Sequence, residues 1–339
     1  MSVQQSALTE QPLFLIGDSG ATRTRLCLVD SEGQIVRHAV TGPGNAFAIG
    51  WSKALTSITA GLQRVLKARS LAKRIRAAVV GSASVTQHGE GSSRIVRIVR
   101  AFAPQATVRV LSDMRIALQG ALGDNPGVVI VSGTGSVVLG KADGLRYVQV
   151  GGWGMLIGDE GSSQWIAREG LRRAAHAFDG TGPATQLQAA FLKHFGVNSF
   201  YDLLPMIYED PTPASLGALA VLVVRMAKGG DQVARAVIRE AGEALGVQAA
   251  VVTKRLRLIC PQVSYQGSVF QAGKIILNPV RKTLKKLCPD ARLVPPILPP
   301  LGGAWLHALG IVGLTPTQES IAAFGGNYNA LFESRLGKD

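Results

Sequence analysis

Three glycine-rich turns carry the side chains in this chain that are most suited to chemistry. The first is Gly17-Asp-Ser-Gly-Ala-Thr-Arg-Thr-Arg25, and the second is Val131-Ser-Gly-Thr-Gly-Ser136. The third runs from Gly151 to Ser162 and holds five glycines beside an Asp-Glu pair. Glycine is costly to order and supplies little core, so such turns are typical of backbone that approaches a ligand closely. They indicate a nucleotide site and phosphoryl transfer.

The first turn has the groups that a cation and a phosphate need. Phosphoryl transfer requires donors around the phosphates, a divalent ion, and a carboxylate that accepts the proton of the attacking hydroxyl. Asp18 follows a short apolar run and can hold a hydrated ion. The same turn holds Gly20, Thr22 and Thr24, and the two threonine hydroxyls can donate to phosphate.

The second turn offers backbone donors, and a separate aspartate offers the carboxylate. The N–H groups of Gly133, Thr134 and Gly135 can wrap the other side of the phosphates. Asp113 lies between an expected strand and an expected helix, where active-site carboxylates of α/β proteins commonly emerge. Structural alternatives remain, because Asp-x-Gly is a common turn and Asp113 could cap its helix. P-loop and Rossmann sites are disfavoured, since neither glycine pattern occurs.

The hydrophobic pattern predicts α/β architecture in two similar halves. Strands are expected over residues 13–17, 24–30, 34–40, 76–80, 108–111, 128–131, 137–141, 147–150 and 262–265. Helices are expected over 51–67, 92–102, around 116–118, and through most of 162–258. Both halves begin with strand, glycine turn and strand, so we expect an internal structural duplication. The expected domains are 1–122 and 123–315, and a C-terminal helix over about 316–339 is expected to pack back on the first.

Composition narrows the function classes. The chain has 339 residues, a hydrophobic fraction of 47% and a formal net charge of +14. The basic residues are spread along expected helices without aromatic interleaving, so we interpret them as solvated faces that help attract an anionic nucleotide and expect no nucleic-acid partner. Neither a membrane span nor a signal peptide is expected, and Met1 to Gln11 is expected to be a disordered lead-in. Three scattered cysteines favour a cytoplasmic location.

The three motifs resemble a known family. Asp18–Thr24, Ser132–Ser136, and Gly151-Gly-Trp-Gly with Gly158-Asp-Glu-Gly-Ser162 are similar to the phosphate and sugar motifs of the BadF/BadG/BcrA/BcrD type. The resemblance is strongest to the N-acetylglucosamine and glucosamine kinase branch of the sugar kinase, Hsp70 and actin superfamily. It implies two ribonuclease H-like domains of the actin and hexokinase type with an interdomain cleft. It also implies ATP-dependent phosphorylation of an amino sugar on its 6-hydroxyl, and a homodimer.

The resemblance also implies roles for individual residues. Asp113 would be the general base, and Asp18 would organise Mg²⁺ through water. Asn45, Ser82 and Asp159 would bind the sugar. The residues expected to border the adenine and ribose of ATP are Gly267, Ser268, Gly303 and Ala304.

Two alternatives to a kinase come from other functional classes. One is an ATP-driven activator of a dehydratase or reductase, whose homodimer holds an iron–sulfur cluster; none of Cys27, Cys260 and Cys288 lies in a glycine-rich loop that opens a helix, so the cluster ligands are not expected here. The other is a sugar-sensing regulator, for which we expect no helix-turn-helix extension here. Within the third turn, Glu160 is interpreted as a residue of a helix start and Trp153 as a packing residue.

Overall fold

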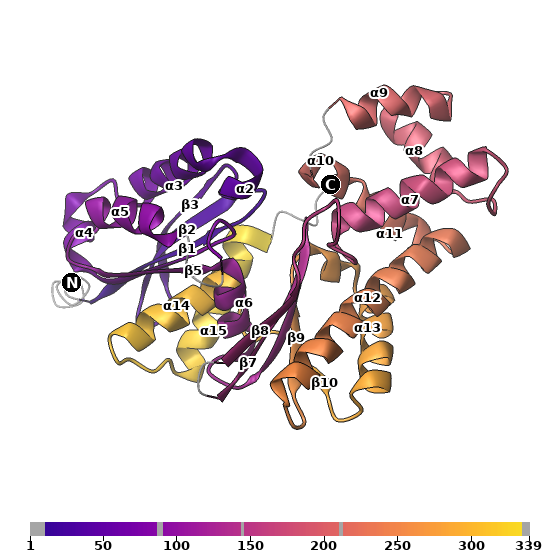
Figure 1. Ribbon diagram of the computed structural model, residues 1–339. Coiled ribbons are helices and arrows are strands. Elements are labelled where there is room, and N and C mark those ends of the chain that lie inside the picture. Colours follow the sequence, from indigo (N-terminus) through magenta and orange to yellow (C-terminus); the bar gives the residue numbers. More distant parts are fainter. Residues whose placement is uncertain (1–10, 87–90, 144–145, 210–212, 334–339) are drawn as a thin grey trace. The chain divides into compact units, whose positions relative to one another are not determined.

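The computed structural model describes residues 11–86, 91–143, 146–209 and 213–333 (Figure 1). The expected disordered lead-in, apart from Gln11, and residues 334–339 of the expected C-terminal helix lie outside this range. Contacts divide the chain into two units, Met1–Asp124 with Pro296–Asp339, and Asn125–Pro295. This division differs from the sequence expectation over residues 296–315, which belong to the first unit.

The first unit is a five-stranded mixed sheet covered by helices on both faces. Its elements are β1 (Leu13–Ser19), β2 (Thr24–Asp30), β3 (Ile35–Thr41), α2 (Ala46–Ile49), α3 (Trp51–Val65), α4 (Arg69–Arg74), β4 (Ile75–Ser82), α5 (Ser92–Phe102), β5 (Thr107–Ser112), α6 (Asp113–Leu122), α14 (Pro300–Ile311), α15 (Gln318–Tyr328) and the π-helical turn η4 (Asn329–Glu333). The strand order is β3-β2-β1-β4-β5. The pairs β3–β2 and β2–β1 are antiparallel, whereas β1–β4 and β4–β5 are parallel.

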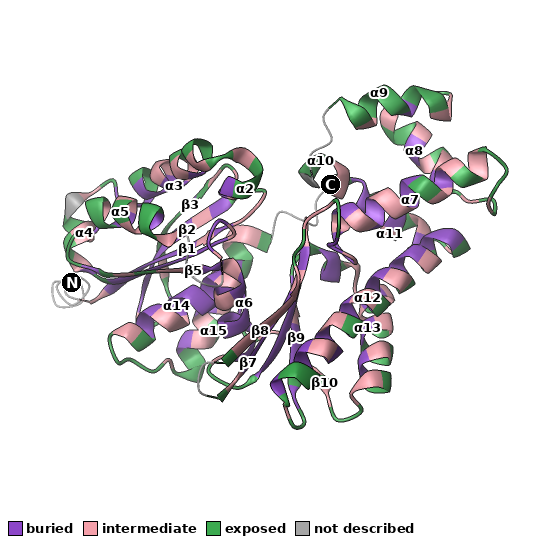
Figure 2. Ribbon diagram, in the orientation of Figure 1, coloured by how far each residue is buried: buried purple, intermediate pink, exposed green. Residues whose placement is uncertain are grey.

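Alternate residues of β1 enter different cores of this unit, which is why the strand reads as a continuous apolar run. Leu13 and Leu15 face the core formed with α3 and α5. Phe14 and Ile16 face the core formed with α6, α14 and α15. Figure 2 shows the resulting buried strands between partly exposed helices.

The second unit repeats the topology of the first. Its elements are β6 (Gly127–Ser132), β7 (Ser136–Ala142), β8 (Arg146–Gly151), α7 (Ser163–Phe178), α8 (Leu187–Phe195), the 3₁₀ turn η2 (Phe200–Asp202), α9 (Leu203–Tyr208), α10 (Pro213–Ala218), α11 (Ala220–Lys228), α12 (Gln232–Leu256), β9 (Gln262–Gln266), the 3₁₀ turn η3 (Ser268–Ala272), α13 (Lys274–Leu287) and β10 (Arg292–Leu293). The order β8-β7-β6-β9-β10 has the same antiparallel and parallel pairs as the first sheet. The two sheets therefore have one topology, as the expected duplication requires.

Candidate active site

Three polar residues lie at the carboxyl ends of adjacent parallel strands in the first unit. The register pairs Ser19 with Ser82 and Ser82 with Ser112. Asp18 next to the end of β1, Ser82 at the end of β4 and Asp113 directly after β5 therefore lie at one edge of the sheet. Ligands of open α/β sheets bind outside this edge. The structure thus brings together the predicted metal-organising, substrate-binding and catalytic residues of this unit.

The first glycine-rich turn is closed by its own hydrogen bonds. The Gly20 N–H donates to Arg23 O at 3.0 Å, and Thr22 is exposed at the tip. Thr24 is fully buried, and its hydroxyl lies 3.1 Å from that of Ser19. Of the two predicted phosphate-binding threonines, only Thr22 is therefore open to a ligand in this conformation; Thr24 builds the framework of the turn.

A loop carrying Asn45 is fixed beside this turn. The Gly44 N–H donates to Gly20 O at 2.9 Å. The Ser84 hydroxyl donates to Gly44 O and accepts from the Ala46 N–H, both at 2.7 Å. Asn45 caps α2 through its Oδ1, which leaves its Nδ2 amide as the donor for a ligand. Sequence reasoning missed Ser84, which has no motif of its own and is identified only by the contacts it makes.

Asp113 has the electrostatics of a general base. It is the first residue of α6, and its Oδ1 accepts the Met114 N–H at 2.9 Å. The N-cap of this helix is Ser112, so the capping alternative for Asp113 is wrong. Burial raises the pKa of Asp113 to about 6, with a further contribution from the negative charge of Asp18, while backbone N–H groups act in the opposite direction. A base with this pKa is largely ionised near neutral pH.

Asp18 has surroundings that fit a magnesium ion. Burial raises the pKa of its carboxyl group, and Arg25 and Arg23 oppose that shift. Within the described ranges, no group of three or more His, Cys, Asp or Glu side chains could hold a metal ion. Mg²⁺ commonly takes one or two carboxylates and completes its shell with water and substrate phosphates. Asp18, whose negative charge contributes to the raised pKa of Asp113, suits that mode.

The second glycine-rich turn lies at the end of β6 in the second unit. The Gly133 N–H donates to Gly135 O at 2.9 Å, and Gly133 O accepts the Ser163 N–H at 2.8 Å. Hydroxyls of Ser132 and Ser136 donate to Gly161 O and Glu160 O, each at 2.8 Å. These hydrogen bonds therefore hold the loop from Gly151 to Gly161 against the second turn. Thr134 lies partly exposed at the tip of the second turn.

Asp159 is built into this junction. It has a left-handed φ of 59° and is only 7% exposed. Its Oδ2 accepts from Gln164 Nε2 at 2.8 Å, and its Oδ1 accepts the Gly154 N–H at 3.3 Å. A Cβ on Gly135 would lie 2.7 Å from Oδ2, so the carboxylate sits directly on the second turn. Burial raises its pKa, and these donors together with the Ser136 N–H oppose the shift.

Gly267 and Ser268 adjoin the second turn as well. β9 runs parallel to β6 and ends beside it, with Gln266 paired to Val131. Gly267 has a φ of +111°, and a Cβ there would lie 2.2 Å from Ser132 O. A Cβ on Gly133 would lie 3.8 Å from the Ser268 hydroxyl. The structure thus brings Ser268 and the second turn together.

Gly303 and Ala304 do not lie in the second unit. Both are buried in α14, which packs on α6 of the first unit. A Cβ on Gly303 would lie 1.9 Å from Ile116 O, so this glycine permits a close helix crossing. The expected C-terminal domain therefore does not include these two residues, and their place beside the adenosine stays a prediction.

Two interpretations within the third glycine-rich turn are also wrong. Trp153 is 70% exposed, and Leu156 and Ile157 are exposed as well, so Trp153 does not pack into a core. The N-cap of α7 is Ser162, whose hydroxyl accepts the Trp165 N–H. Glu160 precedes that cap and accepts from Gln248 Nε2 at 3.4 Å.

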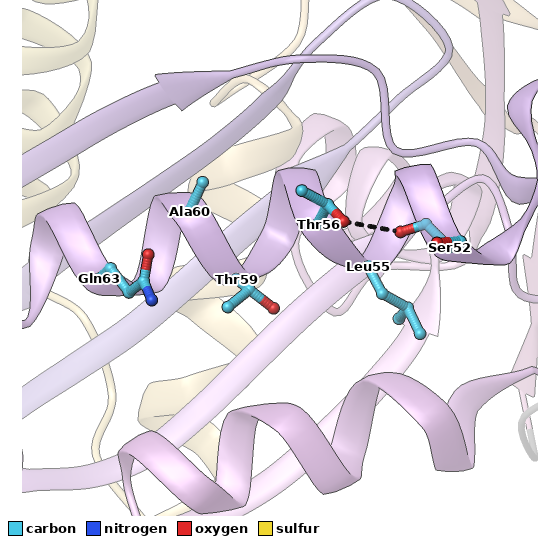
Figure 3. Close-up of a pocket in the computed structure, with 6 residues that line it drawn as sticks. All are labelled: Ser52, Leu55, Thr56, Thr59, Ala60 and Gln63. Carbon is cyan, nitrogen blue, oxygen red and sulfur yellow. Dashed lines mark hydrogen bonds between the residues drawn. The ribbon is translucent and has the colours of Figure 1, made fainter.

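A surface hollow elsewhere in the first unit is unrelated to these residues. It has a volume of about 460 Å³ on the outer side of α3 and is lined by Ser52, Leu55, Thr56, Thr59, Ala60 and Gln63 (Figure 3). Its lining includes none of the residues predicted to bind substrates.

Among the helices in the described part of the chain, none combines the length and hydropathy needed to span a bilayer.

The chain is similar to known proteins over most of its length. The model of the BadF/BadG/BcrA/BcrD ATPase family matches residues 17–308. An N-acetylmuramic acid/N-acetylglucosamine kinase of Clostridium acetobutylicum is 26% identical over 83% of this chain and 93% of its own length. An N-acetyl-D-glucosamine kinase of Dictyostelium discoideum is 27% identical over 88% of this chain and 98% of its own length.

Solved structures show the same fold. A candidate N-acetylglucosamine kinase from Chromobacterium violaceum has a TM-score of 0.64 at 24% identity, covering 88% of this chain and 99% of that one. A ROK family glucokinase from Streptomyces griseus, in complex with glucose and AMPPNP, has a TM-score of 0.57 at 16% identity. It covers 88% of this chain and 98% of that one. The expected two-domain α/β architecture is confirmed.

Proposed function

Because the chain belongs to the BadF/BadG/BcrA/BcrD ATPase family, we propose that it is a kinase that transfers the γ-phosphate of ATP to the 6-hydroxyl of an amino sugar, N-acetylglucosamine or glucosamine. The observation that carries the proposal is the position of Asp113. Its carboxylate emerges at the β5–α6 junction beside Asp18, with a pKa of about 6. That value matches a base that must be ionised near neutral pH and still accept a proton.

The proposed reaction forms one bond and breaks another. The sugar O6 attacks the γ-phosphorus, the bond from that phosphorus to the β–γ bridging oxygen breaks, and ADP leaves. Asp113 accepts the proton of the 6-hydroxyl as the new bond forms. Mg²⁺, held by Asp18 through water, would neutralise charge on the β- and γ-phosphates. Thr22 and the backbone N–H groups of the second turn would orient the phosphates.

Substrate recognition is assigned to residues of both units. Asn45 Nδ2 is a donor for a sugar hydroxyl, and Ser82, at the end of β4, would be a further sugar contact. Asp159 is an acceptor whose carboxylate oxygens retain lone pairs beyond the hydrogen bonds already made. Gly267 and Ser268 would border the nucleoside.

The rival activator function finds no support in the cysteines. Cys27 is buried in β2 and Cys288 lies near the end of α13, while Cys260 is exposed on the loop before β9. None opens a helix from a glycine-rich loop, which is the placement that a shared cluster between two subunits would need. We also propose that the protein is a homodimer in the cytoplasm and has no nucleic-acid or membrane partner. Light scattering of the purified chain measures its oligomeric state.

A substrate screen tests the proposed function. ADP release is followed by a coupled assay over N-acetylglucosamine, glucosamine, N-acetylmannosamine, N-acetylmuramic acid and glucose, each at matched concentration. We expect the highest kcat/KM for one of the first two sugars and ADP release well above the rate with ATP alone. Sugar-independent ADP release that no member of the panel stimulates would contradict an amino-sugar kinase.

A further inference from the structure

The Asp18 carboxylate has a neighbour, Arg25, to which the predicted phosphate and sugar motifs assign no role. Asp18 and Arg25 are directly opposite each other in the β1–β2 register, so their side chains share one face of the sheet. Arg25 Nη1 donates to Asp18 Oδ2 at 3.4 Å. The two side chains are 18% and 17% exposed. The predicted metal-organising carboxylate is thus paired with an arginine largely withdrawn from water.

The end of the described chain holds that arginine in place. The guanidinium carbon of Arg25 lies 5.8 Å from the centre of the Phe332 ring. Phe332 in turn meets the Tyr328 ring at 5.1 Å and the His38 ring, edge-on, at 5.5 Å. Tyr328 is buried at the end of α15, and burial raises the pKa of its hydroxyl to about 12. The segment that holds Tyr328 and Phe332, some 300 residues away in sequence, therefore packs against the Arg25–Asp18 ion pair.

The geometry of this pair is not that of an ion pair kept for stability. A stabilising arginine–carboxylate pair is commonly bidentate, with two parallel short hydrogen bonds. Here there is one long bond, and Arg25 Nε is buried without a hydrogen-bond partner among the described residues. Leaving a buried donor unpaired costs folding free energy. The Arg25 guanidinium therefore has an N–H donor, at Nε, that it does not use within the described residues and that lies near the Asp18 carboxylate.

We propose that Arg25, Tyr328 and Phe332 form a clamp that positions Asp18 for the metal–nucleotide complex and adds a positive charge beside its phosphates. This inference rests on the proposed function, since it assigns a nucleotide to the strand-end site. A magnesium–nucleotide complex remains anionic. A guanidinium fixed beside the Asp18 carboxylate therefore favours its binding. The turn Asn329–Glu333 is π-helical, a form found frequently at functional sites. Arg25 and Phe332 are thus positioning residues that act on nucleotide affinity.

Calorimetric titration of the full chain with MgADP tests the clamp without turnover. Arg25→Met keeps an apolar stem and removes the charge, and we expect a Kd about tenfold higher, the scale of one charge-assisted hydrogen bond. Phe332→Ala should raise the Kd about two- to fivefold, because the ring no longer holds the guanidinium. The MgADP Kd of Arg25→Lys should lie between those of wild type and Arg25→Met, since lysine keeps the charge without the planar group. The KM for sugar should stay within twofold in all three (about 0.4 kcal/mol).

A matched control separates positioning from stability. Phe102 is a partly buried aromatic residue packed on the core of the opposite face of the same sheet. Phe102→Ala should lower Tm and leave the MgADP Kd unchanged. If Phe332→Ala and Arg25→Met lower Tm in the same way but bind MgADP like wild type, the clamp is wrong. If wild type itself binds no MgADP, the proposed function fails, which is a different result.

Discussion

At the scale of single residues, the environment of Asp113 dictates how activity should depend on pH. Its pKa is raised from 3.8 to about 6 by burial and by Asp18. Because the base must be ionised, kcat/KM should fall about tenfold per pH unit below about pH 6 and level off above it.

Stability should not cause that loss. A folded-state pKa above the unfolded value means that ionisation of Asp113 opposes folding, so its protonation at low pH favours the folded state. Melting curves recorded across the same range serve as the control. A kcat/KM that stays flat between about pH 5 and 8 would remove Asp113 from the role of base.

Asp159 is predicted to bind the sugar, and the structure shows which groups hold its carboxylate in place. Its carboxylate holds the Gly154 N–H and the Gln164 amide, and it lies on Gly135. Asp159→Asn should lower kcat/KM for the sugar at least about tenfold, the scale of one charge-assisted hydrogen bond to substrate. Steady-state kinetics with each substrate varied in turn makes the distinction. Weakened ATP affinity with unchanged sugar kinetics would assign Asp159 to the second turn alone.

At the scale of elements, the contact between β9 and the second turn depends on one glycine. Gly267→Ala would place a methyl group 2.2 Å from Ser132 O at a φ of +111°. We expect loss of MgADP affinity and a marked fall in Tm. Gly273→Ala is the matched control, because Gly273 also has a positive φ, +77°, but nothing lies within 4 Å of the added Cβ. Equal effects of the two substitutions would mean that backbone strain, not closeness to the turn, matters.

The elements themselves could be predicted from the sequence because most of them are fixed locally. The strand over Thr24–Asp30 and the helix over Ser92–Phe102 match their predicted bounds, since turn residues and apolar period mark both ends. What could not be predicted depends on long-range contacts. Gly303 fits against Gly120, far away in sequence, and no local pattern reveals that helix crossing. The same holds for Ser84, which fixes the Asn45 loop, and for Phe332 beside Arg25.

At the scale of the whole molecule, the proposed function assigns residues of both units to the same pair of substrates. Asp18 and Asp113 belong to the first unit, and the second turn and Gly267 belong to the second. Transfer to water has to be suppressed, so we expect the units to close when sugar binds. The chain passes between them at Asp124–Asn125 and at Pro295–Pro296. The first crossing lies in Gly123-Asp-Asn-Pro-Gly127, where the glycines and the proline break the helix before the next strand and predict a hinge. Small-angle scattering should show a smaller radius of gyration with saturating amino sugar; an unchanged radius in active enzyme would contradict closure.

The central claim is that Asp113 drives phosphate transfer from ATP to the 6-hydroxyl of an amino sugar. Phosphorus NMR of the products, with wild type and Asp113→Asn compared at saturating ATP and sugar, tests it most directly. We expect wild type to form the sugar 6-phosphate and ADP in equal amounts. Asp113→Asn, still folded and still binding sugar by calorimetry, should be about 10²–10⁴-fold slower. ADP and inorganic phosphate without sugar phosphate, or a wild-type rate for Asp113→Asn, would contradict the account.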